Sequence, residues 1–314
     1  MDARTASYKN ICHMPVALNN PTRALLALFA GASAIGLAPI FVRLSELGPV
    51  ATAFYRLLLA LPVLGVWLLF ENRRTTTVPR ADRKLLLAAG LFFAADLAVW
   101  HWSIRFTTVA NATLLANSAP LFVTLASWLW LGERIKSRFL LGMSIAFSGA
   151  VLLMGESVNL SRTRATGDAL GLLTAVFYAG YIIAVTRLRA RQSTARVMFW
   201  SGAVCCLALL PVALLSGEAL LPHTPRGWLV LAGLALVSHA GGQSLIAHAM
   251  AHLPATFSSV ALLWQTVAAA LLAWLLLAEP LSPVQMAGGV VVLAGILLAR
   301  RTVRPVTQFS EEQR

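Results

Sequence analysis

The segment LWLGERIKSRFLLGMSIAFSGAVLL (129–153) decides the fold, because the chain contains a second version of it, LLLAEPLSPVQMAGGVVVLAGILLA (275–299). Four residues recur at a constant shift of 146 positions: Trp128, Glu133, Gly142 and Gly149 correspond to Trp274, Glu279, Gly288 and Gly295. Two related halves that are both strongly apolar are typical of carriers that alternate between the two faces of a membrane.

The composition is that of a membrane protein. Hydrophobic residues make up 58% of the 314 residues, charged residues only 12%, and the mean hydropathy is +0.75. Soluble domains carry about 25% charged residues, so we expect an all-α protein embedded in a bilayer. The segment Met1–Asn20 lacks the pattern of a cleaved signal peptide and is interpreted as a polar tail. Cys12, Cys205 and Cys206 indicate neither a disulfide framework nor a metal site.

Ten runs are long and apolar enough to span a bilayer, which requires about 20 residues. They are residues 23–44, 49–70, 83–105, 108–131, 137–155, 167–188, 194–216, 226–250, 254–278 and 282–300. Several gaps between them are very short, so consecutive helices are expected to lie antiparallel and close together.

The formal net charge of +13 does not indicate nucleic-acid binding, because Lys and Arg lie almost wholly in the gaps between the apolar runs. With the N-terminus in the cytoplasm, 19 of the 25 Lys and Arg residues fall on the cytoplasmic side and five on the other, while Arg56 lies within a run. By the positive-inside rule, we expect both termini in the cytoplasm.

Five helices per half is an odd number, so the second half is expected to insert with inverted topology. The gap with Arg134, Lys136 and Arg138 corresponds to 280–284, which has no basic residue. The predicted organisation is a cytoplasmic tail (1–22), a first five-helix repeat (23–155), a periplasmic connector (156–166), an inverted repeat (167–301) and a second cytoplasmic tail (302–314).

Asp96 is the only carboxylate well inside a predicted span. A charge near the bilayer centre costs at least about 2.5–3.5 kcal/mol, so such a residue usually faces a cavity or a partner. Trp100 lies one turn further on the same helix face, and an acid beside an indole suits a ligand with an ammonium group and an apolar body. The alternative is a structural acid capped by neighbouring polar groups.

Histidines and amides add candidate ligands for a solute. His101 follows Trp100, and His239 shares a helix face with Gln243. A histidine can relay protons near neutral pH or act as a neutral hydrogen-bonding group between helices. Ser244 lies beside Gln243, and this segment is the better candidate to line a site.

Further polar and aromatic residues near the middle of predicted spans are expected to line the same cavity: Asn117, Tyr178, Tyr181, Trp264 and Gln265. For Asn117 the sequence does not separate cavity lining from packing between helices. Small residues and prolines that permit kinks or close approach are expected to act as gates or hinges: Gly36, Pro39, Pro120, Gly241 and Gly242.

Arg56 lies about two turns inside the outer end of its predicted span and is expected to anchor it, either by extending outward or by pairing with Glu46. Glu133 and Glu279 end two corresponding spans, where a carboxylate is unfavourable with the helix dipole. We expect each to meet a basic residue or the start of the next helix. The sequence has no P-loop, metal-ligand spacing or nucleophile elbow, so no enzyme activity, cofactor or metal is expected.

Two stretches, PVATAFYRLLLALPVL (49–64) and ANATLLANSAPLFVTLASWLWLGERI (110–135), followed by the glycine-bearing helix, resemble the EamA-type drug/metabolite transporter superfamily over residues 23–301. Within it, AADLAVWHWS (94–103) is similar to the YddG-type aromatic amino acid exporters. The resemblance implies a ten-helix carrier of the bacterial inner membrane with a central cavity, which exports amino acids and related metabolites. One departure is that Asp96 corresponds to Gly242 in the second half, which makes the cavity chemically asymmetric.

We therefore expect a secondary carrier that binds a small amino-acid-like solute at mid-membrane and exports it by alternating access. Its expected partners are that solute and the lipid bilayer, as a monomer or weak dimer; proton coupling is left open. The alternatives are a carrier of cationic drugs or purines, an ion channel, for which no selectivity-filter sequence is present, and a membrane-embedded enzyme.

Overall fold

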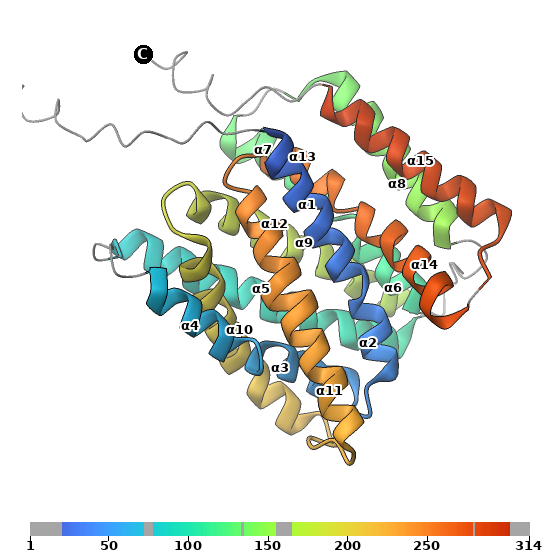
Figure 1. The fold of residues 1–314 in the computed structure, drawn as a ribbon. Coiled ribbons are helices and arrows are strands. Elements are labelled where there is room, and N and C mark those ends of the chain that lie inside the picture. The colour runs from blue at the N-terminus through green and yellow to red at the C-terminus, as the bar shows by residue number, and fades with distance from the viewer. Residues whose placement is uncertain are drawn as a thin grey trace, which may run out of the picture.

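The computed structural model describes residues 21–71, 78–107, 109–132, 135–154, 165–278 and 280–301 (Figure 1). Within these ranges every regular element is a helix and no strand occurs. The two tails, Glu133, Glu279 and most of the predicted connector 156–166 lie outside the described residues. The expectations for them therefore stay predictions.

The helices match the predicted runs to within three residues at each end, and several runs contain more than one helix. Their bounds are α1 Pro21–Gly36, α2 Ala38–Leu44, α3 Pro49–Leu58, α4 Leu61–Glu71, α5 Arg80–Phe106, α6 Val109–Ala116, α7 Ala119–Leu131, α8 Ser137–Met154, α9 Ala165–Arg189, α10 Thr194–Leu215, α11 Pro225–Gly233, η4 Leu234–Gln243, α12 Ser244–Ala249, α13 Ala255–Ala261, α14 Trp264–Leu277 and α15 Pro283–Arg300. In the described part of the chain, nine helical segments are long and apolar enough to cross a membrane. The expectation of an all-α membrane protein is thus confirmed, while α5 is not among these nine.

Prolines explain most of the interruptions within runs. Pro39 lies in the first turn of α2 and Pro120 in the first turn of α7. Proline lacks a backbone N–H and its ring clashes with the preceding turn, so it starts helices more readily than it continues them. The break between α13 and α14 has no proline, yet it corresponds within one position to the break before Pro120 when the repeat shift is applied.

A π-helix interrupts the run that contains the predicted glycine hinge. This element, η4, covers ten residues, LALVSHAGGQ, and joins α11 to α12. Its Gly242 packs closely against α1, because a Cβ there would lie 3.0 Å from the carbonyl oxygen of Gly31. The hydroxyl of Ser238 donates to the carbonyl of Ala34 at 2.9 Å in the same contact. π-helical turns are rare in proteins, and those that occur are often found at functional sites. The π-helix η4 is therefore a candidate element of a site.

Helices α8 and α15 pack side by side along their lengths (Figure 1). Gly142 contacts Gly295, and Gly149 contacts Gly288, so the two helices run antiparallel. Small residues let membrane helices approach closely. These two helices are also the corresponding elements of the two sequence repeats.

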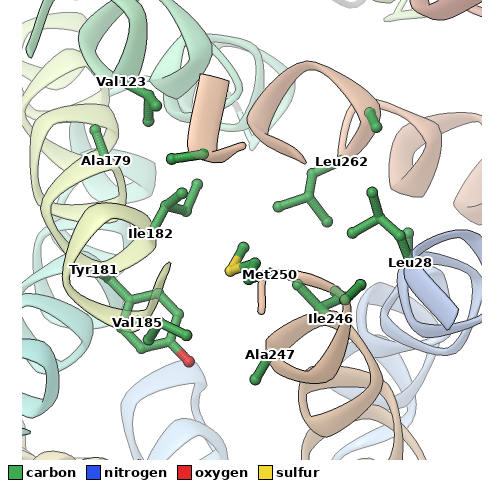
Figure 2. Packing of buried hydrophobic residues seen from close by; sticks show 14 of the residues in the cluster. Leu28, Val123, Ala179, Tyr181, Ile182, Val185, Ile246, Ala247, Met250 and Leu262 are labelled. Atoms are coloured by element: carbon green, nitrogen blue, oxygen red, sulfur yellow. The ribbon is translucent and has the colours of Figure 1, made fainter. Parts of the chain in front are cut away.

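An apolar cluster runs through much of the bundle, and part of it lies at one end, between α1, α7, α9, α12 and α13. Figure 2 shows its side chains pointing toward one another, among them Leu28, Ile182, Ile246 and Leu262, with Met250 at the centre. All of these residues are almost fully buried. These side chains therefore fill the space between the five helices at this end of the bundle.

Polar contacts tie together the same end, which we call the Asp82 side. The buried carboxylate of Asp82 in α5 accepts from Gln192 Nε2 at 2.6 Å and pairs with Arg191 at 3.2 Å. Arg189 Nε donates to the carbonyl of Ala247 at 3.0 Å, and its guanidinium also bonds the carbonyl of Gln192. Residues from α5, the α9–α10 connection and α12 are thus joined into one network.

The opposite end has a different carboxylate contact. Glu46, between α2 and α3, accepts from the backbone N–H of His223 at 2.7 Å, from that of Thr224 at 3.2 Å and from the Thr224 hydroxyl. The Thr224 hydroxyl bond, followed by the two backbone bonds, lowers the pKa of the Glu46 carboxyl. Glu46 therefore engages the start of α11 rather than Arg56, and the sequence-based pairing of Arg56 with Glu46 is wrong.

Candidate functional site

Opposite charges lie within the helix bundle at Arg56 in α3 and Asp96 in α5. Both side chains are partly buried, and their charges interact electrostatically. Arg56 also interacts with Tyr178 and Tyr181 of α9. Its Nε atom is buried and has no hydrogen-bond partner in the described part of the chain. The predicted Asp96 site thus contains a cation that the sequence analysis had assigned to anchoring.

Four rings form a stack beside this pair of charges. Tyr178 stacks on Tyr181 with ring centroids 6.2 Å apart, and Tyr181 stacks on Phe93 at 4.7 Å. Phe93 stacks in turn on His239 at 5.8 Å with an interplanar angle of 15°. The stack connects α9, α5 and η4 and contains both predicted tyrosines, whose role as a wall for the solute stays a prediction.

Gln243 and Tyr181 are hydrogen-bonded to each other at this stack. Gln243 Nε2 donates to the Tyr181 hydroxyl at 3.0 Å, and both side chains are buried. The bond satisfies one polar group on each of η4 and α9. Gln243 therefore positions a tyrosine as well as presenting its own amide.

His239 is the most unusual polar residue of the site. It is 1% exposed, and both of its ring nitrogens are buried without a hydrogen-bond partner among the described residues. Buried polar atoms in proteins are nearly always paired. Gly202 of α10 lies against the ring, since a Cβ there would be 3.8 Å from His239 Nε2. The small residue leaves the ring edge open at this point.

A small cavity of about 10 Å³ lies where the two helix breaks meet. Its lining includes Asn117 and Pro120 at the α6–α7 break, Tyr178 of α9, and Ser259 and Gln265 around the α13–α14 break. This volume accommodates about one water molecule. Asn117 Nδ2 is buried without a partner in the described part of the chain. The predicted residues Asn117, Pro120, Tyr178 and Gln265 are thus brought together.

Trp264 precedes Gln265 but its indole is directed to α1. Its Nε1 donates to the Ser33 hydroxyl at 2.9 Å, and its ring contacts the edge of Phe29 with centroids 5.9 Å apart. Ser33 donates to the carbonyl of Phe29 at 2.9 Å. Trp264 therefore links α14 to α1 in this structure, and it is not among the residues that line the small cavity.

The remaining predicted residues lie on the elements of this site with less direct geometry. Trp100 is one turn beyond Asp96 in α5, and the side chain of His101 lies outside the described residues. Ser244 is buried, and its hydroxyl has no hydrogen-bond partner among the described residues. The five predicted hinge residues all lie at helix irregularities: Gly36 and Pro39 at the α1–α2 break, Pro120 at the start of α7, and Gly241 and Gly242 in η4. Their roles in motion stay predictions.

A second hollow lies away from these residues. It has a volume of about 280 Å³ between α5, α7 and α9 and is lined mainly by apolar side chains, with Arg187 among them. Trp130 on its wall is 79% exposed, so the hollow faces outward. No cluster of three or more His, Cys, Asp or Glu side chains suited to a metal occurs in the described ranges.

Two residues of the candidate site, Arg56 and Phe93, were not predicted from the sequence. Arg56 had a detectable signal in the sequence, because it is the only Lys or Arg well inside a predicted span and its charge is opposite to that of Asp96. Phe93 had none, since a phenylalanine in an apolar helix is ordinary.

Apolar helices that surround partly buried opposite charges make this a multi-pass membrane protein with charged residues in its interior. The chain belongs to the EamA-like transporter family, whose sequence model matches it twice, over residues 22–155 and 165–301.

Several curated proteins are similar to this chain. The pseudopaline exporter of Pseudomonas aeruginosa is 30% identical over 243 residues, covering 77% of this chain and 84% of the exporter. A probable terminal-alkyne amino-acid exporter of Streptantibioticus cattleyicolor is 31% identical over 229 residues, covering 71% and 75%. A solved crystal structure superposes with a TM-score of 0.75 over 88% of this chain and 98% of the other. Because the two sequences are only 18% identical, this similarity supports the fold alone.

Proposed function

We propose that this protein is a secondary carrier of the bacterial inner membrane that exports small amino-acid-like metabolites by alternating access. The observation that carries the proposal is the placement of Asp96 and Arg56 beside the tyrosine stack, within a chain of the EamA-like transporter family. Intramembrane charges are expensive and usually mark the path of a substrate. A solute with an ammonium group and an apolar body fits an acid that lies beside aromatic rings.

The topology we propose is ten spans in two inverted repeats, with both termini in the cytoplasm. The two separate matches of the family model support a duplication. The antiparallel packing of the corresponding helices α8 and α15 supports inversion, since parallel copies would not run in opposite directions. Helix α5 has 27 residues, about 40 Å at 1.5 Å per residue, which is long enough to be the tenth span.

The two ends of the bundle support a gating role. The Asp82 side is closed by the apolar cluster and by the network around Gln192. The distribution of Lys and Arg favours the cytoplasm for this side. We infer that the structure represents a state closed to the cytoplasm, and that solute enters the site when this end opens. The helix breaks at Pro39, Pro120 and η4 supply the points of bending.

The printed names of the relatives support export and an amino-acid-like cargo. One relative is named as an exporter of pseudopaline and another as a probable exporter of a terminal-alkyne amino acid. In this chain, we assign the ammonium group of the solute to Asp96 and its apolar body to Trp100 and the tyrosines. Gln243, His239 and Gln265 supply hydrogen bonds.

The test is counterflow of labelled amino acids into proteoliposomes, with Asp96→Asn and Trp100→Ala as variants and Asp168→Asn as the matched control at the start of α9. We expect saturable, competitor-sensitive exchange that Asp96→Asn lowers by at least about tenfold, as for loss of a charge-assisted hydrogen bond. Displacement only by cationic drugs or purines would assign another cargo. Unsaturable current would indicate a channel, and unchanged exchange in both variants would refute the site. Equal rates with and without a pH gradient would remove any role for protons.

A further inference from the structure

Unpaired hydrogen-bond donors converge on the tyrosine stack from three different parts of the fold. They are Arg56 Nε of α3, Asn117 Nδ2 at the α6–α7 break and the ring nitrogens of His239 in η4, all buried without partners in the described part of the chain. Arg56 interacts with both tyrosines, and Asn117 shares the small cavity with Tyr178. His239 joins through Phe93, which stacks on Tyr181.

Most of these unpaired atoms are hydrogen-bond donors. A guanidinium has only donors, and the amide nitrogen of asparagine is also a donor. Neutral imidazole adds one donor and one acceptor. Asp96 is the carboxylate whose charge interacts with that of Arg56, without a direct ion pair between the two in the described ranges. The interior therefore has more donors than acceptors at this point.

A carboxylate is the ligand group that such a set accommodates. Its two oxygens offer about four acceptor sites, and guanidinium binds them in a fork geometry that ammonium cannot match. The electrostatic interaction with Asp96 leaves Arg56 Nε without a hydrogen-bond partner in the described part of the chain. A ligand group with acceptor atoms beside Arg56 would supply that partner.

We propose that Arg56 binds the carboxylate of the transported solute while Asp96 binds its ammonium group, so that the carrier selects molecules that bear both charges. The inference rests on the proposed function and deepens it by naming the substrate class as amino carboxylates. Amines that lack a carboxylate and acids that lack an amine are both poor ligands, because each leaves one buried charge of the protein without its partner.

The stacked rings determine where the rest of the solute lies. The rings of Tyr178 and Tyr181 are parallel to within 15°, and Phe93 continues their stack. An apolar side chain attached to the amino carboxylate is placed against these faces when its two charges bind at Arg56 and Asp96. The site thus assigns a separate position to each of three groups of the ligand: the carboxylate, the ammonium group and the apolar body.

The first experiment uses the unaltered protein. Binding of L-phenylalanine, phenethylamine and 3-phenylpropionate is measured by isothermal titration on the purified carrier in detergent, because these three differ only in the two charged groups. We expect the amine and the acid each to bind at least about tenfold more weakly than the amino acid, as for a lost bond to a charged group. If the amine binds as tightly as the amino acid, the assignment of Arg56 is overturned while the cation-binding role of Asp96 stands.

The second experiment separates the two charges by mutation. Arg56→Gln is expected to weaken phenylalanine by at least about tenfold and to leave phenethylamine unchanged, so the preference for the amino acid disappears. Arg226→Gln, on an exposed arginine in the first turn of α11, is the matched control and retains that preference. Equal weakening of both ligands by Arg56→Gln would show a structural role for Arg56.

Arg56→Lys covers the case in which the glutamine variant does not fold. The lysine variant keeps the charge but loses the fork, so it is expected to bind phenylalanine with intermediate affinity. Unchanged affinity in this variant would contradict a carboxylate bound by the guanidinium. If no amino carboxylate of any size binds the unaltered protein while a drug or purine does, the proposed function itself fails, which is a different outcome from those above.

Discussion

Gly149 of α8 and Gly288 of α15 meet backbone to backbone: a Cβ on Gly288 would lie 2.9 Å from the carbonyl oxygen of Gly149, and one on Gly149 would lie 2.8 Å from that of Gly288. Gly142 and Gly295 meet in the same way, at 2.8 and 2.6 Å. The repeat aligns Gly142 with Gly288 and Gly149 with Gly295, whereas the structure pairs them crosswise. Exchanging the halves turns each contact into the other, so the glycines of the repeat are also its packing partners.

Replacing Gly288 by alanine is expected to destabilise this contact by about 1–3 kcal/mol, because an added methyl group overpacks a backbone contact that cannot yield. The melting temperature of the purified protein in detergent measures the effect. Gly289→Ala is the matched control on the next residue, where a Cβ would lie 3.5 Å from Val267 Cγ1 in ordinary contact. Similar melting temperatures for both variants would contradict the close approach.

The Asp82 network is expected to hold its end of the bundle shut, so Asp82→Asn favours opening. Arg191 is 64% exposed, and solvent therefore screens the pair and limits the expected loss to about 1 kcal/mol. This loss raises the open population roughly fivefold. The measurement is the rate at which a maleimide labels Ile246→Cys in a background without Cys12, Cys205 and Cys206.

Lys84→Gln, an exposed charge in the same helix turn region, is the control for that experiment. It should leave the labelling rate unchanged. A labelling rate that is equally low in Asp82→Asn and in the unaltered background would mean that the apolar cluster alone closes this end.

The membrane-spanning segments were predictable because apolar runs and the internal repeat can be read directly from the sequence. The run 137–155 corresponds to α8 at Ser137–Met154, and 282–300 to α15 at Pro283–Arg300. The break between α13 and α14 was not predicted, since no proline marks it, although the repeat shift places it within one position of the break before Pro120. The π-helix was not predictable either, although Gly241 and Gly242 indicated a weak point in the helix.

The site was predictable as a set of residue types and less so as a geometry. Asp96, Tyr178, Gln243 and His239 were identified because polar groups in apolar spans require partners. The role of Arg56 was missed, because sequence spacing gives the face of a helix but not its rotation in the bundle. The direction of the Trp264 indole toward Ser33 was missed for the same reason. Its role in binding stays a prediction.

His239→Phe is expected to separate stability from transport. Phenylalanine keeps the stack on Phe93 and removes two buried nitrogens that lack partners in the described ranges. Replacing an unsatisfied polar group by an apolar one of similar shape is neutral or stabilising. We therefore expect an unchanged or higher melting temperature and a loss of counterflow of at least about tenfold.

The control for His239 is His223→Phe, at an exposed residue near Glu46. It should retain transport. If His239→Phe lowers the melting temperature and leaves counterflow intact, the histidine is a structural residue whose nitrogens contribute to packing alone.

His252, in the turn between α12 and α13, is expected to make stability depend on pH. Burial, and then the nearby charges of His248 and Arg189, lower the pKa of His252 below its ordinary value of 6.5. The unfolded chain therefore binds a proton more readily than the folded protein, and stability falls as pH drops from 6.5 through the lowered pKa. The melting temperature in detergent should decrease between pH 7.5 and 5.5, and His252→Gln should reduce that decrease. An identical pH profile for His252→Gln and the unaltered protein would assign the dependence to other groups.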